Sequence, residues 1–91
     1  MLVGRRFSVR GRVQRVGFRL FVEDAARREN LRGYVRNEHD GSVEIVAEGD
    51  ADSMRRFEMA VRRGPSGARV DAVDTTELEA SSRFSSFRVT E

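Results

Sequence analysis

The fold is decided in the stretch Phe7–Asn30, whose sequence is FSVRGRVQRVGFRLFVEDAARREN. Apolar and polar residues alternate in it up to Val13, which is the period-two pattern of a half-buried strand. From Phe18 onward the apolar residues recur at helical spacing, and the pattern predicts a helix that ends near Asn30. The stretch therefore predicts a strand that is followed at once by a helix.

The remaining chain continues this alternation without a linker, a repeat or a low-complexity segment, which predicts a single domain over residues 1–91. Between two of its strands, Asp40-Gly41 indicates a two-residue hairpin turn, because such turns need positive φ. The predicted elements after the first helix are strands Gly33–Glu38 and Ser42–Glu48, a second helix capped by Asp50 or Asp52 and stopped by Gly64-Pro65, a strand Val70–Leu78 and a short strand at Phe87 and Val89.

This order is strand, helix, strand, strand, helix, strand, plus a short terminal strand. Two helices that cover one face of an antiparallel sheet are the most economical packing for it. We therefore predict an α+β fold of the ferredoxin-like, split βαβ type.

The chain contains no cysteine and one histidine. Disulfides, thiolate zinc sites and thiol nucleophiles are therefore excluded, and no spacing of carboxylates resembles a metal loop, so that we expect neither a metal nor a cofactor. No apolar run is long enough to span a bilayer, and the apolar start Met1–Val3 is broken too early for a signal peptide. A cytoplasmic monomer without membrane contact is expected.

The charges nearly balance, with 17 basic against 15 acidic residues and a net charge of +2. This balance does not indicate a nucleic-acid-binding protein. All the basic residues are arginines, which genome composition alone can explain. Many of them nevertheless precede the first acidic residue, Glu23, and a local excess of guanidinium favours an anionic ligand because guanidinium grips phosphate oxygens in pairs.

The segment Gln14–Arg19 joins the first predicted strand to the first predicted helix. Backbone N–H groups at a helix start have no acceptor within the helix, and the small Gly17 allows close approach, so this segment is a natural anion cradle. Arg19 lies in the first helical turn, where the helix dipole disfavours a cation by about 0.3–1 kcal/mol. An anion between the two would explain its position, and a solvated surface arginine is the alternative.

Asn37 continues the apolar face that Gly33 and Val35 form on the second predicted strand. A polar side chain in that place must find partners or lose desolvation energy. Asn37 is therefore a second candidate functional residue. An asparagine that begins the hairpin turn is the simpler alternative.

Two long motifs resemble the signatures of the acylphosphatase family. The first is Val9–Arg19, VRGRVQRVGFR, in which the strand enters a phosphate loop. The second is Gly33–Asn37, GYVRN, followed at the family's spacing by Gly41, Val43 and Gly49. The stretch after the second helix is also similar to the family, with Gly64-Pro65, Ala68 and Val70, so that the resemblance covers nearly the whole chain.

The resemblance implies a ferredoxin-like fold and a metal-independent hydrolase that splits the carboxyl-phosphate bond of acyl phosphates by in-line attack of water. It implies that Arg19 binds the substrate phosphate and that Asn37 positions the water. It further implies that the loop binds the substrate phosphoryl group, or a phosphate or sulfate ion, through Gln14, Arg15, Val16, Gly17, Phe18 and Arg19.

This chain departs from the family pattern at Arg15, where the family most often has glycine. If the position needs positive φ, a residue other than glycine costs about 1–2 kcal/mol. The Arg15 side chain could instead point outward and raise the positive potential that draws in anionic substrates.

Two other functions fit the same strand order. An RNA-binding module would need stacking aromatic residues on two central strands, and here the segment Arg32–Asn37 offers only Tyr34 while the first strand offers Phe7 alone. A domain that binds anions without catalysis is the second alternative. The presence of both Arg19 and Asn37 favours the enzyme.

Overall fold

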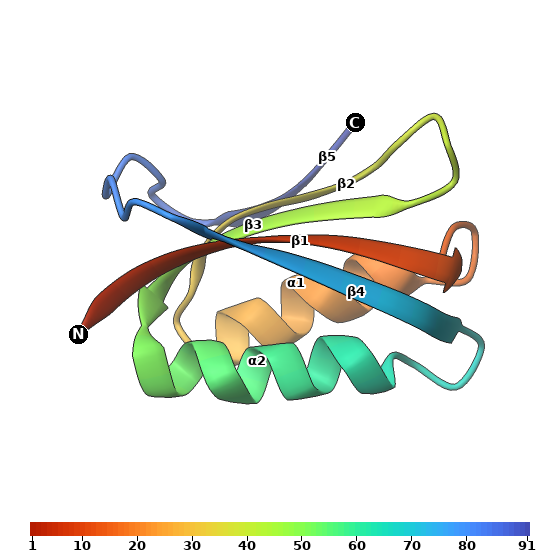
Figure 1. Cartoon of the computed structure of the whole chain (residues 1–91), viewed down its shortest axis with the longest axis horizontal. Helices are drawn as coiled ribbons and strands as arrows, with labels where there is room; N and C mark the ends of the chain where they lie inside the picture. The colour runs from red at the N-terminus through yellow and green to blue at the C-terminus, as the bar shows by residue number, and fades with distance from the viewer.

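The computed structural model describes residues 1–91 and contains two helices and five strands (Figure 1). No helix in it is both long enough and apolar enough to cross a membrane. In chain order the elements are β1 (Leu2–Arg12), α1 (Phe18–Arg28), β2 (Arg32–Asn37), β3 (Val43–Asp50), α2 (Ala51–Arg63), β4 (Arg69–Leu78) and β5 (Phe87–Thr90).

The strands form one sheet in the order β4-β1-β3-β2-β5, and both helices lie against the same face (Figure 1). The pairs β1–β3, β1–β4 and β2–β3 are antiparallel, as predicted for the ferredoxin-like fold. The short terminal strand β5 pairs with β2 in parallel, so the sheet is mixed rather than purely antiparallel. The predicted fold class is thus confirmed, with one parallel edge added.

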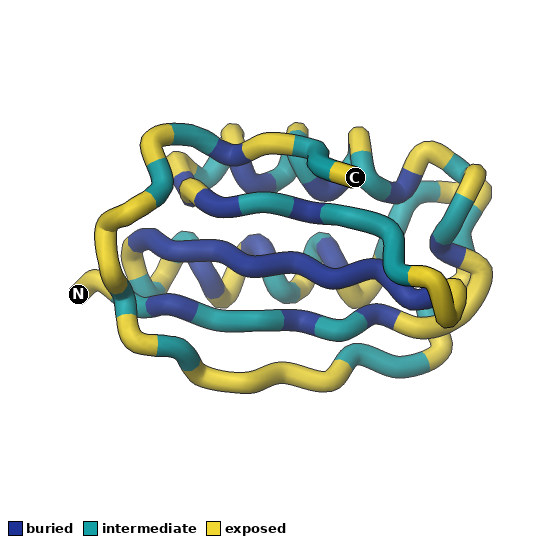
Figure 2. The backbone as a smooth tube through the Cα atoms, turned by 90° about the horizontal axis from the view of Figure 1, so that it is seen from above, coloured by how far each residue is buried: buried dark blue, intermediate teal, exposed yellow.

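The core lies between the helices and the sheet, and β3 is its central strand. Figure 2 shows β3 buried along nearly its whole length, whereas the edge strand β4 is largely exposed. Phe57 of α2 packs edge-on against Phe7 of β1 and Phe87 of β5, with ring centroids 5.8 and 6.2 Å apart. These aromatic contacts join the second helix to two strands that are not neighbours in the sheet.

Helix α2 begins as its sequence indicates. Asp50 is the N-cap, and its carboxylate accepts a hydrogen bond of 3.0 Å from the backbone N–H of Asp52. The helix ends before Gly64, which has φ 67, a left-handed value that glycine adopts without steric cost.

Strand β1 begins earlier than its hydrophobic pattern indicates. The alternation starts only at Phe7, because Arg5 and Arg6 stand next to each other, yet the ladder with β3 extends to the pair Leu2–Asp50. Pairing with neighbours on both sides supplies the backbone hydrogen bonds that this arginine-rich start needs.

The two-residue hairpin predicted at Asp40-Gly41 is wrong. The Glu38 N–H donates to the carbonyl of Ser42 at 2.9 Å and the Gly41 N–H to that of Glu38 at 3.2 Å, which leaves a three-residue loop. Only Gly41 in this loop has positive φ, at 94. The Asp40 carboxylate accepts from both the N–H and the hydroxyl of Ser42, at 2.9 and 2.6 Å, and so holds the turn without a left-handed residue at position 40.

The register of the sheet brings two distant segments together. Val43 of β3 lies opposite Val9 of β1 on one side and opposite Asn37 of β2 on the other. The loop that follows β1 and the end of β2 therefore lie at the same end of the molecule (Figure 1).

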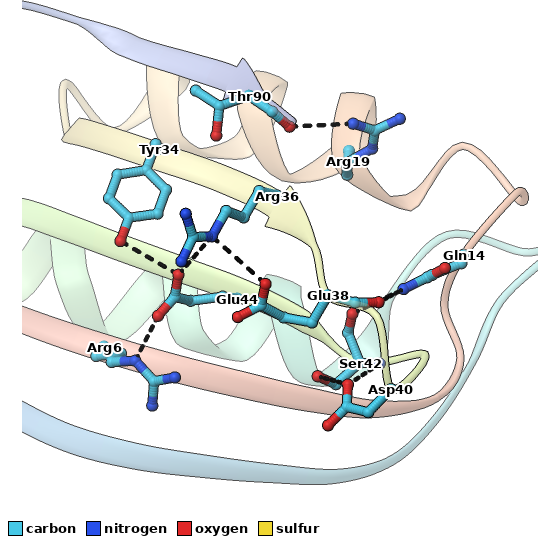
Figure 3. Close-up of polar contacts among 10 residues, drawn as sticks. All are labelled: Arg6, Gln14, Arg19, Tyr34, Arg36, Glu38, Asp40, Ser42, Glu44 and Thr90. Carbon is cyan, nitrogen blue, oxygen red and sulfur yellow. Dashed lines mark hydrogen bonds and ion pairs between the residues drawn. The ribbon is translucent and has the colours of Figure 1, made fainter.

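The uncovered face of the sheet carries a buried carboxylate, Glu44, surrounded by cations (Figure 3). Arg6 Nε donates to it at 2.6 Å and the Tyr34 hydroxyl at 3.2 Å. Arg36 Nε lies 2.9 Å away as an ion pair, with its N–H directed off the carboxylate so that no hydrogen bond forms. Burial raises the pKa of Glu44, but the Arg6 hydrogen bond and the charges of Arg36 and Arg6 outweigh burial and hold the pKa below its ordinary value.

Replacing Gly33 with alanine should strongly destabilise the protein. Gly33 has φ 147, and a Cβ atom there would lie 1.9 Å from the carbonyl oxygen of Val46 in the neighbouring strand. We expect Gly33→Ala to lower the free energy of unfolding by about 2–4 kcal/mol in a urea titration. Gly41→Ala is the matched control, because φ there is 94 but the space is open, and it should cost only about 1–2 kcal/mol. Equal losses would contradict the close strand approach.

The Glu44 cluster should make stability depend on pH. Because the folded-state pKa of Glu44 is depressed, its contribution is complete above the unfolded value of about 4.3 and is lost as pH falls through the folded value. We expect Glu44→Gln to lower the free energy of unfolding near pH 7 by about 1–2 kcal/mol, with the difference from wild type shrinking below about pH 4.3. Glu79→Gln, an exposed carboxylate, is the control. A Glu44→Gln difference that stayed constant down to acidic pH would contradict the role of the charge.

Candidate active site at the start of helix α1

The loop between β1 and α1 turns sharply through two left-handed residues. Arg15 has φ 62, and Gly17, the N-cap of α1, has φ 77 and ψ 13. An N-cap residue usually has an extended conformation and a side chain that accepts from the first turn. Here no side chain caps the helix, and no acidic residue lies in its first turn. The positive end of the helix dipole thus has no negative protein group against it.

The backbone N–H groups of this loop are free. The hydrogen bond from the N–H of Phe21 to the carbonyl of Gly17, 3.1 Å long, is the first that closes onto α1, and the N–H groups of residues 15–19 donate to no other protein group. Successive free N–H groups in a left-handed turn form a concave donor set that suits an anion.

A small pocket of about 130 Å³ opens directly beside these N–H groups. A volume of this size suits a phosphoryl group rather than a large ligand. Its lining residues are Val13, Arg15, Gly17, Phe18, Arg19, Leu20 and Asn37.

Arg19 projects from the first turn of α1 toward the end of β5 (Figure 3). Its Nη1 donates to the carbonyl oxygen of Thr90 at 3.2 Å, which is the only hydrogen bond of this guanidinium within the protein. The half-buried side chain is therefore anchored by one nitrogen while its other N–H groups stay available.

Asn37 ends β2 at the wall of the same pocket. Its Oδ1 atom is buried and accepts no hydrogen bond from the protein. A buried amide oxygen without a protein partner costs free energy, and this atom is free to accept a hydrogen bond from a water molecule or a ligand in the pocket.

Gln14 ties the loop to the β2–β3 hairpin. Its Nε2 donates to the carbonyl oxygens of Glu38 and Ser42, at 2.8 and 2.9 Å (Figure 3). The side chain is thus engaged in fixing the loop. A second, open hollow of about 370 Å³ adjoins this contact and is lined by Gln14, Arg19, Asn37, Glu38, His39 and Glu91.

The other predicted loop residues contribute mainly backbone. The side chains of Val16 and Phe18 pack against the hydrophobic core, and Phe18 is only 1% exposed. Their side chains therefore point away from a bound anion, and only their N–H groups can face it.

The positive φ of Arg15 shows that this position is left-handed, which a residue other than glycine adopts at a cost of about 1–2 kcal/mol. The side chain is nevertheless exposed and lines the pocket. The structure thus shows both features that the sequence left open, a backbone cost at position 15 and an exposed Arg15 side chain that adds positive charge beside the pocket.

The sequence did not indicate Val13, Leu20 or Thr90 as site residues, although Val13 and Leu20 line the pocket and the Thr90 carbonyl accepts from Arg19. Leu20 is 67% exposed, and a leucine outside the apolar stripe of the helix was the one sequence signal that could have drawn attention to it. The Thr90 carbonyl carries no sequence signal, because its contact depends on how β5 joins the sheet.

No three His, Asp or Glu side chains converge to hold a metal ion. A wider depression of about 360 Å³ lies on the outer face of α2, but all its charged side chains are already in ion pairs within the protein. Arg62, for example, pairs with Glu58 at 3.0 Å. The pocket at the start of α1 is therefore the better site, despite its smaller volume.

Relatives of known family match the chain over most of its length. A family model described as acylphosphatase matches residues 5–89. The acylphosphatase of Salinibacter ruber is 48% identical over 81 residues, which span 89% of this chain and 85% of that protein. The acylphosphatase of Deinococcus radiodurans is 55% identical over 71 residues, 78% of this chain and 82% of its own length.

The fold agrees with these similarities. The crystal structure of acylphosphatase from Bacillus subtilis superimposes with a TM-score of 0.94 at 38% identity, over the whole of both chains. The family model reaches from within β1 into β5, and thus includes both the free N–H groups of the loop and Asn37. The resemblance predicted from two motifs is confirmed, and the chain belongs to the acylphosphatase family.

Proposed function

We propose that this protein hydrolyses acyl phosphates at the pocket beside α1, with Arg19 and Asn37 as its working residues. One observation carries the assignment of the site. A single pocket is lined by Arg19, by a loop with free N–H groups and by Asn37, whose buried Oδ1 has no partner. The first two hold an anion, and the third accepts a hydrogen bond from a water molecule.

The phosphoryl group of the substrate lies in the loop, with its charged oxygens on the N–H groups of residues 15–19 and on the Arg19 guanidinium. Bidentate guanidinium contacts and preorganised N–H donors stabilise the charge that spreads over these oxygens in the transition state. Because Thr90 holds one nitrogen of Arg19, little reorganisation is needed when the substrate binds.

Asn37 positions the nucleophile. Its Oδ1 accepts a hydrogen bond from a water molecule and holds it in line with the bond to be broken. The water oxygen forms a bond to phosphorus while the bond from phosphorus to the acyl oxygen breaks. The acyl group leaves with that oxygen as a carboxylate. An amide is too weak a base to deprotonate water, so a phosphoryl oxygen of the substrate takes the proton, and the products are a carboxylate and inorganic phosphate.

A carboxylate is a good leaving group, so the reaction needs no acid on that side. We therefore propose a metal-independent hydrolase without a cofactor. We further propose that residues 1–91 form one domain and that the protein acts as a monomer in the cytoplasm. Phosphate or sulfate ions should occupy the loop, since they share the shape and charge of the phosphoryl group. Neither a nucleic acid nor a membrane is part of this proposal.

Phosphate release from acetyl phosphate, with EDTA present, tests the proposal. We expect wild-type turnover to be insensitive to EDTA, and Arg19→Ala to lower kcat at least about 10²–10³-fold and to raise KM, because both binding and transition-state charge depend on the guanidinium. Asn37→Ala should lower kcat by a similar factor with a smaller change in KM, since this residue contacts the water rather than the phosphate.

Arg32→Ala is the matched control, because Arg32 is an exposed arginine at the opposite end of β2. It should leave both kinetic constants near the wild-type values. Absence of turnover in a folded wild-type chain would overturn the enzymatic proposal in favour of a domain that only binds anions. Turnover that survives in Asn37→Ala would overturn the role of Asn37 alone.

A further inference from the structure

Two guanidinium groups, those of Arg15 and Arg19, line the pocket. Ten of the 17 arginines lie within 4 Å of a carboxylate in an ion pair. Arg15 and Arg19, the two arginines that line the pocket, are not among them. Arg19 is directed by Thr90, whereas the Arg15 side chain has no hydrogen-bond partner in the protein. Arg15 is thus a free guanidinium at the rim of a site that already has its anion-binding groups.

We propose that Arg15 is a specificity-determining residue that selects acyl phosphates whose acyl group carries a second negative charge, such as a carboxylate. This inference rests on the proposed function of the same pocket. The free N–H groups of the loop and the Arg19 guanidinium together supply hydrogen-bond donors for the oxygens of one phosphoryl group. Arg15 is left to bind an anion at the other end of the substrate.

The distribution of acidic residues favours one side of the site for the second negative charge of the substrate. Glu38 and Glu91 line the adjoining hollow, together with Gln14, Arg19, Asn37 and His39. No acidic residue lines the pocket that contains Arg15. A negatively charged acyl group is therefore repelled from the hairpin side and attracted to the Arg15 side.

The backbone conformation supports a dedicated position for this side chain. Arg15 holds φ 62, where glycine or asparagine would be favoured and arginine is strained. The side chain forms no hydrogen bond or ion pair inside the protein that would offset this strain. Strain of this kind is common where a side chain serves a ligand.

Binding of two matched phosphonates tests the proposal directly. 3-Phosphonopropionate and propylphosphonate share the phosphonate and the chain length, and only the first carries a carboxylate. Calorimetric titration should be done at a pH at which both phosphonates are dianions. We expect wild type to bind 3-phosphonopropionate about threefold to tenfold more tightly, as a partly exposed guanidinium–carboxylate pair allows.

Arg15→Asn removes the charge and keeps a residue that accepts left-handed φ, so it should fold and reduce the affinity ratio to about one. Arg15→Lys should keep part of the preference. Arg12→Asn is the matched control, because Arg12 is an exposed arginine three positions earlier that does not line the pocket, and its ratio should equal that of wild type.

Three results would overturn the inference. The wild-type affinity ratio of 3-phosphonopropionate to propylphosphonate could be one, the preference could survive in Arg15→Asn, or it could be lost equally in Arg12→Asn. The last result would mean general attraction by positive charge instead of selection by Arg15. If wild type hydrolyses acetyl phosphate but binds the two phosphonates equally, the inference is overturned and the proposed function stays intact. A ratio that depends on Arg15 in a chain without turnover would support the specific role and overturn the hydrolase.

Discussion

The backbone register around Val43 is the constraint on which the rest of the structure depends. Val43 pairs with Val9 on one side and with Asn37 on the other, so a single residue of β3 fixes where β1 and β2 end relative to each other. The loop after β1 and the amide of Asn37 consequently meet at one pocket, although the two segments are distant in sequence. A slip of one residue in the β2–β3 ladder would turn Asn37 to the opposite face of the sheet, and a slip in the β1–β3 ladder would displace the loop after β1, so either slip would separate the two halves of the site.

The two faces of the sheet solve different physical problems. The helix side is apolar, with Val43, Ile45 and Ala47 of β3 in the core. The opposite side has no helix over it, and there Glu44 accepts from Arg6 and Tyr34. Glu48 accepts from the backbone N–H groups of Ser81 and Ser82, at 2.9 and 3.0 Å, so this buried carboxylate holds the segment after β4. Most of the arginines thus form ion pairs on the surface, and only Arg15 and Arg19 line the pocket beside α1.

Sequence periodicity was sufficient to predict the elements and the fold class, because the helices and strands each bury one face. It could not predict the features that depend on pairing between distant segments. The alternation missed the start of β1 at Leu2, since its hydrogen bonds come from the ladders on either side. The parallel pairing of β5 with β2 was missed for the same reason. The Asp40-Gly41 turn was placed correctly but given the wrong geometry, because the Asp40 carboxylate stabilises a longer loop.

The residues of the candidate site also fall into two groups, those that the sequence indicates and those that depend on contacts between distant segments. Arg19 and Asn37 could be singled out because each is a polar residue at a position that costs energy. The Thr90 carbonyl could not, since a backbone oxygen has no side-chain signature. Gln14 was predicted within the phosphate loop, but sequence alone did not indicate that its side chain fixes that loop to the hairpin through two carbonyl groups.

Three unfavourable features meet at this pocket. Arg15 is held at positive φ, a cation lies in the first turn of α1, and Asn37 Oδ1 is buried without a partner. Each costs roughly 1 kcal/mol when taken alone. An anion in the loop would offset the cost of the cation in α1, and a water molecule on Asn37 would offset the cost of its unpaired oxygen.

The fold tolerates these costs because the β1–β3 ladder and the aromatic contacts of Phe57 are made by residues that do not line the pocket. Local strain beside a stable scaffold is what a preorganised anion site requires, since the groups that bind the transition state must be in place before the substrate arrives.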